Sequence, residues 1–336
     1  MNTCPAFDHF IVLPRLRVQN ANAVSSPLTH GFPSMTAFLG LMWALQRKTH
    51  QLGLDLSFDA VGVICHGHEE QVNHDGFVHT FRLTRNPVDK DGSTAAIVEE
   101  GRIHLEISLV FAVSSQHWYR EPDARETDVA TVAALVAGLR VAGGSVLPPA
   151  QPAWARYRPY LVDLSGSEED RLRTFARARL RWLPGYALVA RDDLLQARAA
   201  AAPTVGGASA RLDAWLSFAR INWSYRPAAG ESTAGAGRGE WINDKRGAGW
   251  IVPIPVGYGA LGPLQPAGQV ANARDATTDF RFVESVYSVG EWLSPHRLKS
   301  PEQLLWYADS RPQDGAYRCR NDYQPPDTAA PIAESD

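Results

Sequence analysis

The run from Leu13 to Ser34 concentrates side chains that donate hydrogen bonds and contains no acidic residue. Its donors are Arg15, Arg17, Gln19, Asn20, Asn22, Ser25, Ser26, Thr29 and His30. Arginine binds phosphate and side-chain amides bond to base edges, so such a surface suits a ligand that carries phosphates and bases. The alternative is a network of turns in which Asn20, Asn22 and Ser26 bond to their own backbone.

Further candidates for the same chemistry lie outside this run. They are Arg85, Asn86, Arg140, Gly143, Gly144, Arg274 and Arg297. The pair Gly143 and Gly144 would let the backbone approach a phosphate closely, although a turn that ends a helix is the simpler interpretation. In the stretch 85–102, turn formers and charges surround an apolar patch at 95–98, which favours a hairpin that contacts a partner.

The sequence gives no pattern typical of a metal or catalytic centre. Residues 65–70 read Cys-His-Gly-His-Glu-Glu, but no second pair of cysteines or histidines stands at zinc-site spacing. Three scattered cysteines form neither a disulfide framework nor a zinc quartet, which fits a reducing compartment. His30, His66 and His296 could each act as an acid or base, yet no His, Tyr and Lys cluster accompanies them. We therefore expect no catalytic residue, no metal and no cofactor.

The composition fits a folded protein without a general affinity for nucleic acid. The chain has 336 residues, is 45% hydrophobic and carries a formal net charge of −3. Only four of its 33 basic residues are lysines, and arginine is the cation that binds phosphate in a fork. A GC-rich genome is the better explanation of this bias, so the bias supports RNA binding only weakly. The apolar run at 10–13 is too short for a signal peptide, so we expect a cytoplasmic protein without membrane contact.

Apolar periodicity predicts a mixed α+β fold. We expect strands at 10–18, 58–65, 77–83 and 103–113, and helices at 33–50 and 123–141, the second closed by Gly143 and Gly144. The order strand, helix, strand, strand hairpin, helix, strand resembles a ferredoxin-like or RNA-recognition-motif core, which we assign to residues 1–150. Residues 151–323 should add a helical module at 167–218 and an irregular, β-rich C-terminal part, and residues 324–336 a flexible tail.

Five blocks of sequence resemble the Csy-two subunits, members of the Cas-five family, of type I-F CRISPR surveillance complexes. They are Leu13–Ser34 with 37–40 and 44–47, 83–87 with 91–102, 139–145, 250–255 with 257–258, and 272–275 with 290–297. The resemblance spans most of the chain. It is interrupted at 151–165, 199–209 and 228–244, where we carry over no functional residue.

The resemblance implies a non-catalytic subunit that holds the 5′ handle of the CRISPR RNA. It implies that this subunit pairs with the large Csy-one subunit, adjoins the first backbone subunit, Csy-three, and meets target DNA only through the complex. It also implies a thumb-like hairpin within 85–102 that presses on the guide. Two alternatives remain open: a metal-independent endoribonuclease that processes repeat RNA, and a scaffold that contacts protein alone.

Overall fold

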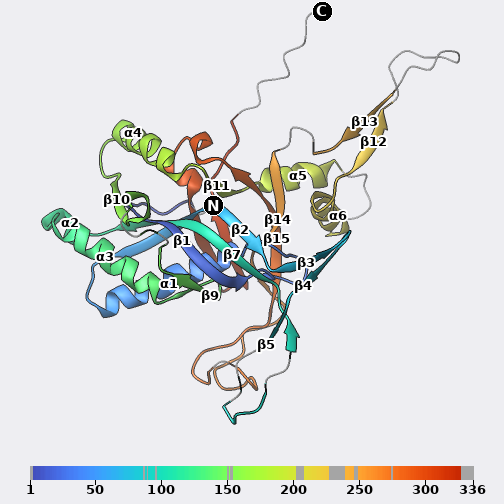
Figure 1. The fold of residues 1–336 in the computed structure, drawn as a ribbon, viewed down its shortest axis with the longest axis horizontal. Coiled ribbons are helices and arrows are strands. Elements are labelled where there is room, and N and C mark those ends of the chain that lie inside the picture. The colour runs from blue at the N-terminus through green and yellow to red at the C-terminus, as the bar shows by residue number, and fades with distance from the viewer. Residues whose placement is uncertain are drawn as a thin grey trace, which may run out of the picture.

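One large antiparallel sheet organises the molecule. The computed structural model describes residues 3–85, 88, 90–94, 97–149, 151, 154–201, 208–226, 239–245, 249–273 and 275–326. Eleven strands of these described residues join the sheet, and helices pack around it (Figure 1). The fold is therefore mixed α/β, as the apolar periodicity predicts.

The first part of the sheet has the strand order β2-β7-β1-β9. Its strands are β1 (His9–Asn22), β2 (Ser57–Glu70), β7 (Arg102–Ser114) and β9 (Gly144–Leu147), with β8 (Arg140–Val141) beyond β9. Helices α1 (Met35–Gln51) and α3 (Ala124–Ala137) lie on one face of these strands, where Phe38, Met42 and Val132 are fully buried. Helix α1 begins where the hydroxyl of Ser34 accepts the N–H of Thr36, which satisfies an unpaired donor of the first turn.

The second part of the sheet continues from β2. Its strands are β16 (Trp306–Arg311), β17 (Ala316–Asn321), β14 (Trp250–Ala260), β15 (Val283–Leu293) and β11 (Tyr186–Ala190). Strand β11 pairs with both β15 and β2, so these five strands and β2 close into a ring. Strand β10 (Tyr160–Asp163) pairs with the start of β1, along the edge that β9 uses further on.

The other face of the central strands is covered by a second set of short elements. They are α4 (Glu168–Ala178) and the 3-10 turns η2 (Arg179–Trp182), η3 (Pro295–Arg297) and η4 (Pro301–Leu304); α2 (His117–Arg120) and η1 (Ala155–Tyr157) lie in loops. Phe175, Trp182 and Leu304 pack there against Phe10 and Val110, and none is more than 1% exposed. The sheet is thus buried on both faces, which explains the nearly continuous apolar runs of β1 and β7.

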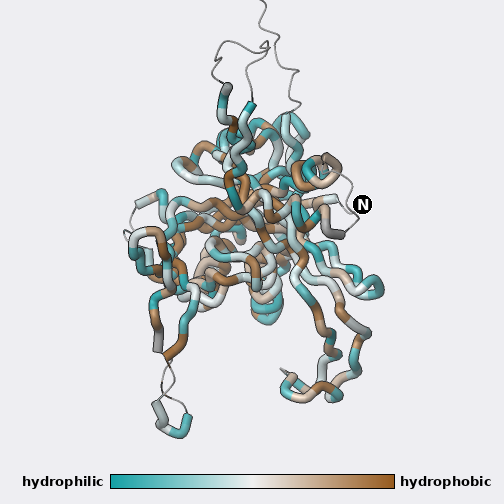
Figure 2. Tube along the Cα trace, turned by 90° about the vertical axis from the view of Figure 1, so that its right-hand side faces the viewer, coloured by the Kyte–Doolittle hydropathy of each residue, from teal (hydrophilic) through white to brown (hydrophobic). Residues whose placement is uncertain are grey.

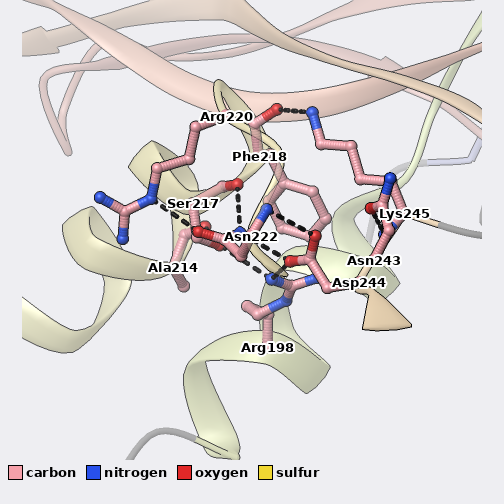
Figure 3. Close-up of polar contacts among 9 residues, drawn as sticks. All are labelled: Arg198, Ala214, Ser217, Phe218, Arg220, Asn222, Asn243, Asp244 and Lys245. Carbon is pink, nitrogen blue, oxygen red and sulfur yellow. Dashed lines mark hydrogen bonds and ion pairs between the residues drawn. The ribbon is translucent and has the colours of Figure 1, made fainter. Parts of the chain in front are cut away.

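A helix pair and a short hairpin lie outside β14 and β15. They are α5 (Asp192–Ala200), α6 (Ala208–Phe218), β12 (Trp223–Arg226) and β13 (Glu240–Asn243). Figure 3 shows the polar network at the base of this hairpin. The carboxylate of Asp244 binds the guanidinium of Arg198 at 2.7 Å and accepts both the backbone and the side-chain N–H of Asn222. This carboxylate therefore fixes the hairpin to the helix pair.

Two hairpins separate β2 from β7. They are β3 (Val72–Asp75) with β4 (Val78–Phe81), and β5 (Leu83–Arg85) with β6 (Ile97–Glu99). The β5–β6 hairpin and the described residues of 261–273 and 275–282 leave the body of the molecule at the same end (Figure 1), and Figure 2 shows two separate projections there. Among the described residues no helix is long and apolar enough to cross a membrane.

Most predicted elements are confirmed, and three predictions are wrong. The strand predicted at 77–83 is divided between β4 and β5. The helix predicted at 123–141 ends at Ala137 with Gly138 as its cap, and Gly143 and Gly144 instead connect β8 to β9. The predicted helical module contains strand β11, whose residues Ala187 and Val189 are completely buried in the sheet.

Candidate functional site

Two adjoining hollows lie where the end of β1 meets the β8–β9 hairpin. The first, which we call the arginine hollow, has a volume of about 440 Å³. It is lined by Gln19, Asn20, Gln71, Arg82, Leu83, Glu100, Arg102, Arg140, Gly143 and Ser145. The second, about 350 Å³, lies between this hairpin and α1 and shares Arg140 and Gly143 with the first; Asn22 and Ser25 also line it. The fold thus brings together residues that are more than a hundred positions apart in the sequence.

Close backbone packing joins β1 to β9 at this point. A side chain at Gly144 would meet the backbone N of Ala21 at 2.7 Å and the carbonyl oxygen of Gln19 at 2.8 Å. The N–H of Asn22 donates to the carbonyl of Ala142 at 2.8 Å, and Gln19 stands opposite Ser145 in the register. Gly144 is therefore required by the approach of two strands.

Four of the predicted residues present uncommitted polar groups beside the arginine hollow. Arg17 and Gln19 are exposed, and their side chains bond to no described residue. Asn20 has a left-handed backbone, with φ 58°. Its backbone N–H donates to the ring of His104, and its exposed side-chain amide bonds to no described residue. Arg140 is exposed, and its only described bond is to the carbonyl of Gly143 at 3.1 Å. These groups can donate to phosphate or base oxygens without breaking a structural contact.

The remainder of the donor-rich run is used by the loop itself. The amide of Asn22 bonds to the backbone of Val24 in both directions, and the hydroxyl of Ser26 bonds to Thr29. The hydroxyl of Ser25 accepts the N–H of Ser34 at 2.9 Å. These residues follow the alternative of a turn network, and His30, also on this loop, lies 3.6 Å from the carboxylate of Glu70.

Arg15 is held inside the sheet rather than presented to solvent. Its side chain is 12% exposed, and its guanidinium binds Glu106 at 2.8 Å. The backbone N–H of Arg15 donates to the hydroxyl of Ser108, and this hydroxyl lies 2.7 Å from the ring Nε2 of His66. Burial lowers the pKa of His66 below its ordinary value; in the neutral ring Nδ1–H donates to the carbonyl of Pro184, and Nε2 accepts from Ser108. This chain of bonds fixes the bulge between Leu13 and Leu16, two residues before Arg17.

The other predicted residues are spread over the molecule. Arg85 lies in β5, and Arg297 lies in η3 with its guanidinium 4.0 Å from Glu291. Asn86 and Arg274 fall outside the described residues. Among the described side chains that line the arginine hollow, Arg297 is absent.

Arg82, Arg102 and the side-chain amide of Gln71 also line this hollow and were not among the predicted residues. Arg102 binds Glu100 at 2.6 Å, and Arg82 binds the amide of Gln71 at 2.7 Å. Arg102 begins β7 and pairs with Asn22 of β1, whereas Arg82 lies within the insertion between β2 and β7 and is held beside the end of β2 by its backbone bond to Gln71. Within the described part of the chain, no group of three or more His, Cys, Asp or Glu side chains could hold a metal ion.

The fold and this site define a mixed α/β protein with a large antiparallel sheet and a hollow rich in arginine and amide groups. A family model described as CRISPR-associated protein (Cas_Csy2) matches residues 11–319. The chain is also 45% identical over 312 residues to the CRISPR-associated protein Csy2 of Pseudomonas aeruginosa (strain UCBPP-PA14), covering 92% of this chain and 94% of that relative. The chain therefore belongs to the Csy2 family of the type I-F CRISPR system, and the resemblance seen in the sequence is confirmed.

Proposed function

We propose that this chain is a non-catalytic, RNA-binding subunit of a type I-F CRISPR complex and that the arginine hollow holds the 5′ handle of the guide. The observation that carries the proposal is a set of donors with N–H groups that bond to no described residue: Gln19, Asn20 and Arg140 line the hollow, and the exposed Arg17 lies two residues before Gln19 on β1. Guanidinium groups would bind phosphates, and amides would hydrogen-bond splayed bases, while pairing between guide and DNA would supply target specificity.

The topology supports a ferredoxin-like core within this proposal. Strands β1, β2, β7 and β9 with helices α1 and α3 follow the order strand, helix, strand, strand, helix, strand along the chain. In this core β1 is central and ends at the arginine hollow, and β5–β6 would be the thumb-like hairpin. We assign the core to residues 1–150 and its completion to 151–323, and we place the complex in the cytoplasm.

The partners in the proposal are those of the family. The chain would pair with the large Csy-one subunit, adjoin the first Csy-three subunit of the backbone, and reach target DNA through them. Holding a handle in this way needs no catalytic group. Two candidate acid–base residues are already engaged in bonds, because His66 lies between Ser108 and Pro184 and His296 bonds to Ser294.

The proposal is tested by crosslinking a uniformly thiouridine-labelled guide in the assembled complex and mapping the crosslinked peptides. We expect crosslinks within 17–22 and 140–145. Crosslinks confined to α4 on the opposite face, or none to this chain, would contradict the proposal. The same purified chain is incubated with repeat RNA and a chelator, and the appearance of cleaved product would favour the endoribonuclease alternative instead.

A further inference from the structure

A third cavity lies beside the arginine hollow and has a different lining. Its volume is about 440 Å³, within the range of about 300 to 1,000 Å³ that is usual for small-ligand sites. Rings of Phe32, Tyr186, Trp250 and Trp292 line it, together with the strand end Cys65–Glu70. We call it the aromatic pocket.

The rings of this pocket form a continuous series. The centroids of Tyr186 and Trp250 are 5.5 Å apart, those of Trp250 and Trp292 are 6.3 Å apart, and those of Trp292 and Phe32 are 4.8 Å apart. The inner members pack on the core, whereas Tyr186 is 47% and Trp250 is 51% exposed. The planes of Tyr186 and Trp250 are 74° apart, so a flat ligand that enters the pocket would stack on the face of one ring and contact the other at an angle.

The polar groups of the pocket suit the edge of a base better than a phosphate. The carboxylate of Glu70 lines the pocket 3.6 Å from the ring of His30, and His68 is exposed beside it. A carboxylate repels phosphate but accepts hydrogen bonds from a base amino group. Arginine does not line this cavity in the described part of the chain.

The aromatic pocket and the arginine hollow lie on opposite sides of the same two strand ends. Glu70 and Ile103 line the pocket, whereas their chain neighbours Gln71 and Arg102 line the hollow. Gln71 donates its N–H to the carbonyl of Arg102 at 2.8 Å, so the two strand ends are held together where they divide the cavities. The two cavities are thus separated by the residues of these two strand ends.

We propose that the aromatic pocket holds one unstacked nucleobase of the RNA bound at the arginine hollow. The base stacks on the face of Trp250 and meets Tyr186, whose ring is inclined at 74° to it, while Glu70 accepts a hydrogen bond from the base amino group. This inference rests on the proposed function, because it takes the RNA in the hollow as given. A protein partner would favour a broad apolar surface, whereas here the rings surround a cavity of small-ligand size.

The test uses assembled complexes in which 2-aminopurine replaces each handle base in turn. This fluorescent base is quenched when it stacks on an aromatic ring. We expect Trp250→Ala to raise the fluorescence severalfold at one position only, and Tyr186→Ala to affect the same position. The matched control is Trp241→Ala, which removes a tryptophan that is 62% exposed and lies in β13, outside the pocket. It should change no position.

Affinity gives an independent measurement with the full chain and synthetic handle RNA. Removing one stacking base costs about 1 to 3 kcal/mol, so an abasic site at the responsive position should weaken binding about 5- to 150-fold. In Trp250→Ala the same abasic site should have little further effect, because its partner is already missing. Trp250→Phe keeps a ring and should restore most of the affinity, which separates loss of stacking from misfolding.

The outcomes distinguish this inference from the function on which it rests. If Arg17→Ala weakens handle binding but no position responds to Trp250→Ala, the pocket holds no base and the inference is overturned. If Trp250→Ala releases a protein subunit without any response from the RNA, the pocket is a protein contact, and the inference is also overturned. If Arg17→Ala has no effect on handle binding, it is the proposed function that fails.

Discussion

Arg17 is the exposed cation of β1 whose removal gives the clearest quantitative prediction. Its guanidinium bonds to no described residue, so it can neutralise one phosphate of the RNA and release the counterion condensed there. For single-stranded nucleic acid each such contact contributes about 0.7 to the slope of log K against log salt concentration. Arg17→Gln should therefore reduce that slope by about 0.7, which corresponds to roughly fivefold weaker binding at 0.1 M salt.

The assay is fluorescence anisotropy of a labelled 5′-handle RNA with the purified full chain, at several salt concentrations. The matched control is Arg173→Gln, because Arg173 is an exposed arginine on α4 that already binds Glu169 and Asp170. It should leave the slope unchanged, since charges farther apart than about 10 Å are largely screened at 0.1 M salt. The double variant Arg17→Gln with Arg140→Gln should lower the slope by about 1.4. An unchanged slope in Arg17→Gln, or an equal change in the control, would refute this reasoning.

Three further predictions concern stability. Gly144→Ala should lower the free energy of unfolding by about 1 to 3 kcal/mol, because the new methyl group meets the backbone of β1. The control Gly40→Ala lies in open space on α1 and should raise the free energy of unfolding by up to about 1 kcal/mol. Equal melting temperatures of the two variants would contradict this prediction. Asp244→Ala should increase hydrogen exchange in β12 and β13 while the central sheet stays protected, because Arg198 loses its carboxylate partner; uniform loss of protection would argue against a local role. Burial lowers the pKa of His66 below 6.5, so the unfolded chain binds a proton more readily than the folded one, and the free energy of unfolding should fall as the pH drops from about 7 to 5.5. His66→Gln should weaken this pH dependence. Denaturation curves at each pH measure it, and the same pH dependence in the variant would contradict the reasoning.

Local sequence signals predicted the central elements well. The helix that begins after Ser34 and the alternating strand at 103–113 are found as α1 and β7, because a cap and a periodic apolar face determine them locally. The strand β11 could not be found in this way. Its five residues lie between helices in the sequence, and only pairing with β2 and β15 makes them a strand.

The candidate site was predictable only where its residues are close in the sequence. Arg17, Gln19 and Asn20 are close in the sequence, and a run without acids identified them. Arg102 reaches the hollow through the register of β7 and β1, and Arg82 through its backbone bond to Gln71, neither of which a local pattern encodes. For Asn22 and Ser26 the sequence offered both RNA contact and a turn network, and the structure shows their bonds within the loop.

The ring closed by β11 has a consequence for how the chain acquires its structure. Val61 of β2 pairs with Trp306, and Cys65 pairs with Tyr186, so an early strand receives its outer neighbours from much later parts of the chain. Pairings of such long sequence separation form slowly, and until they form the edge of β2 offers unpaired amide and carbonyl groups to other molecules. During synthesis the edge of β2 therefore stays unpaired until the second half of the polypeptide has been made. Premature termination would leave a fragment that is prone to self-association.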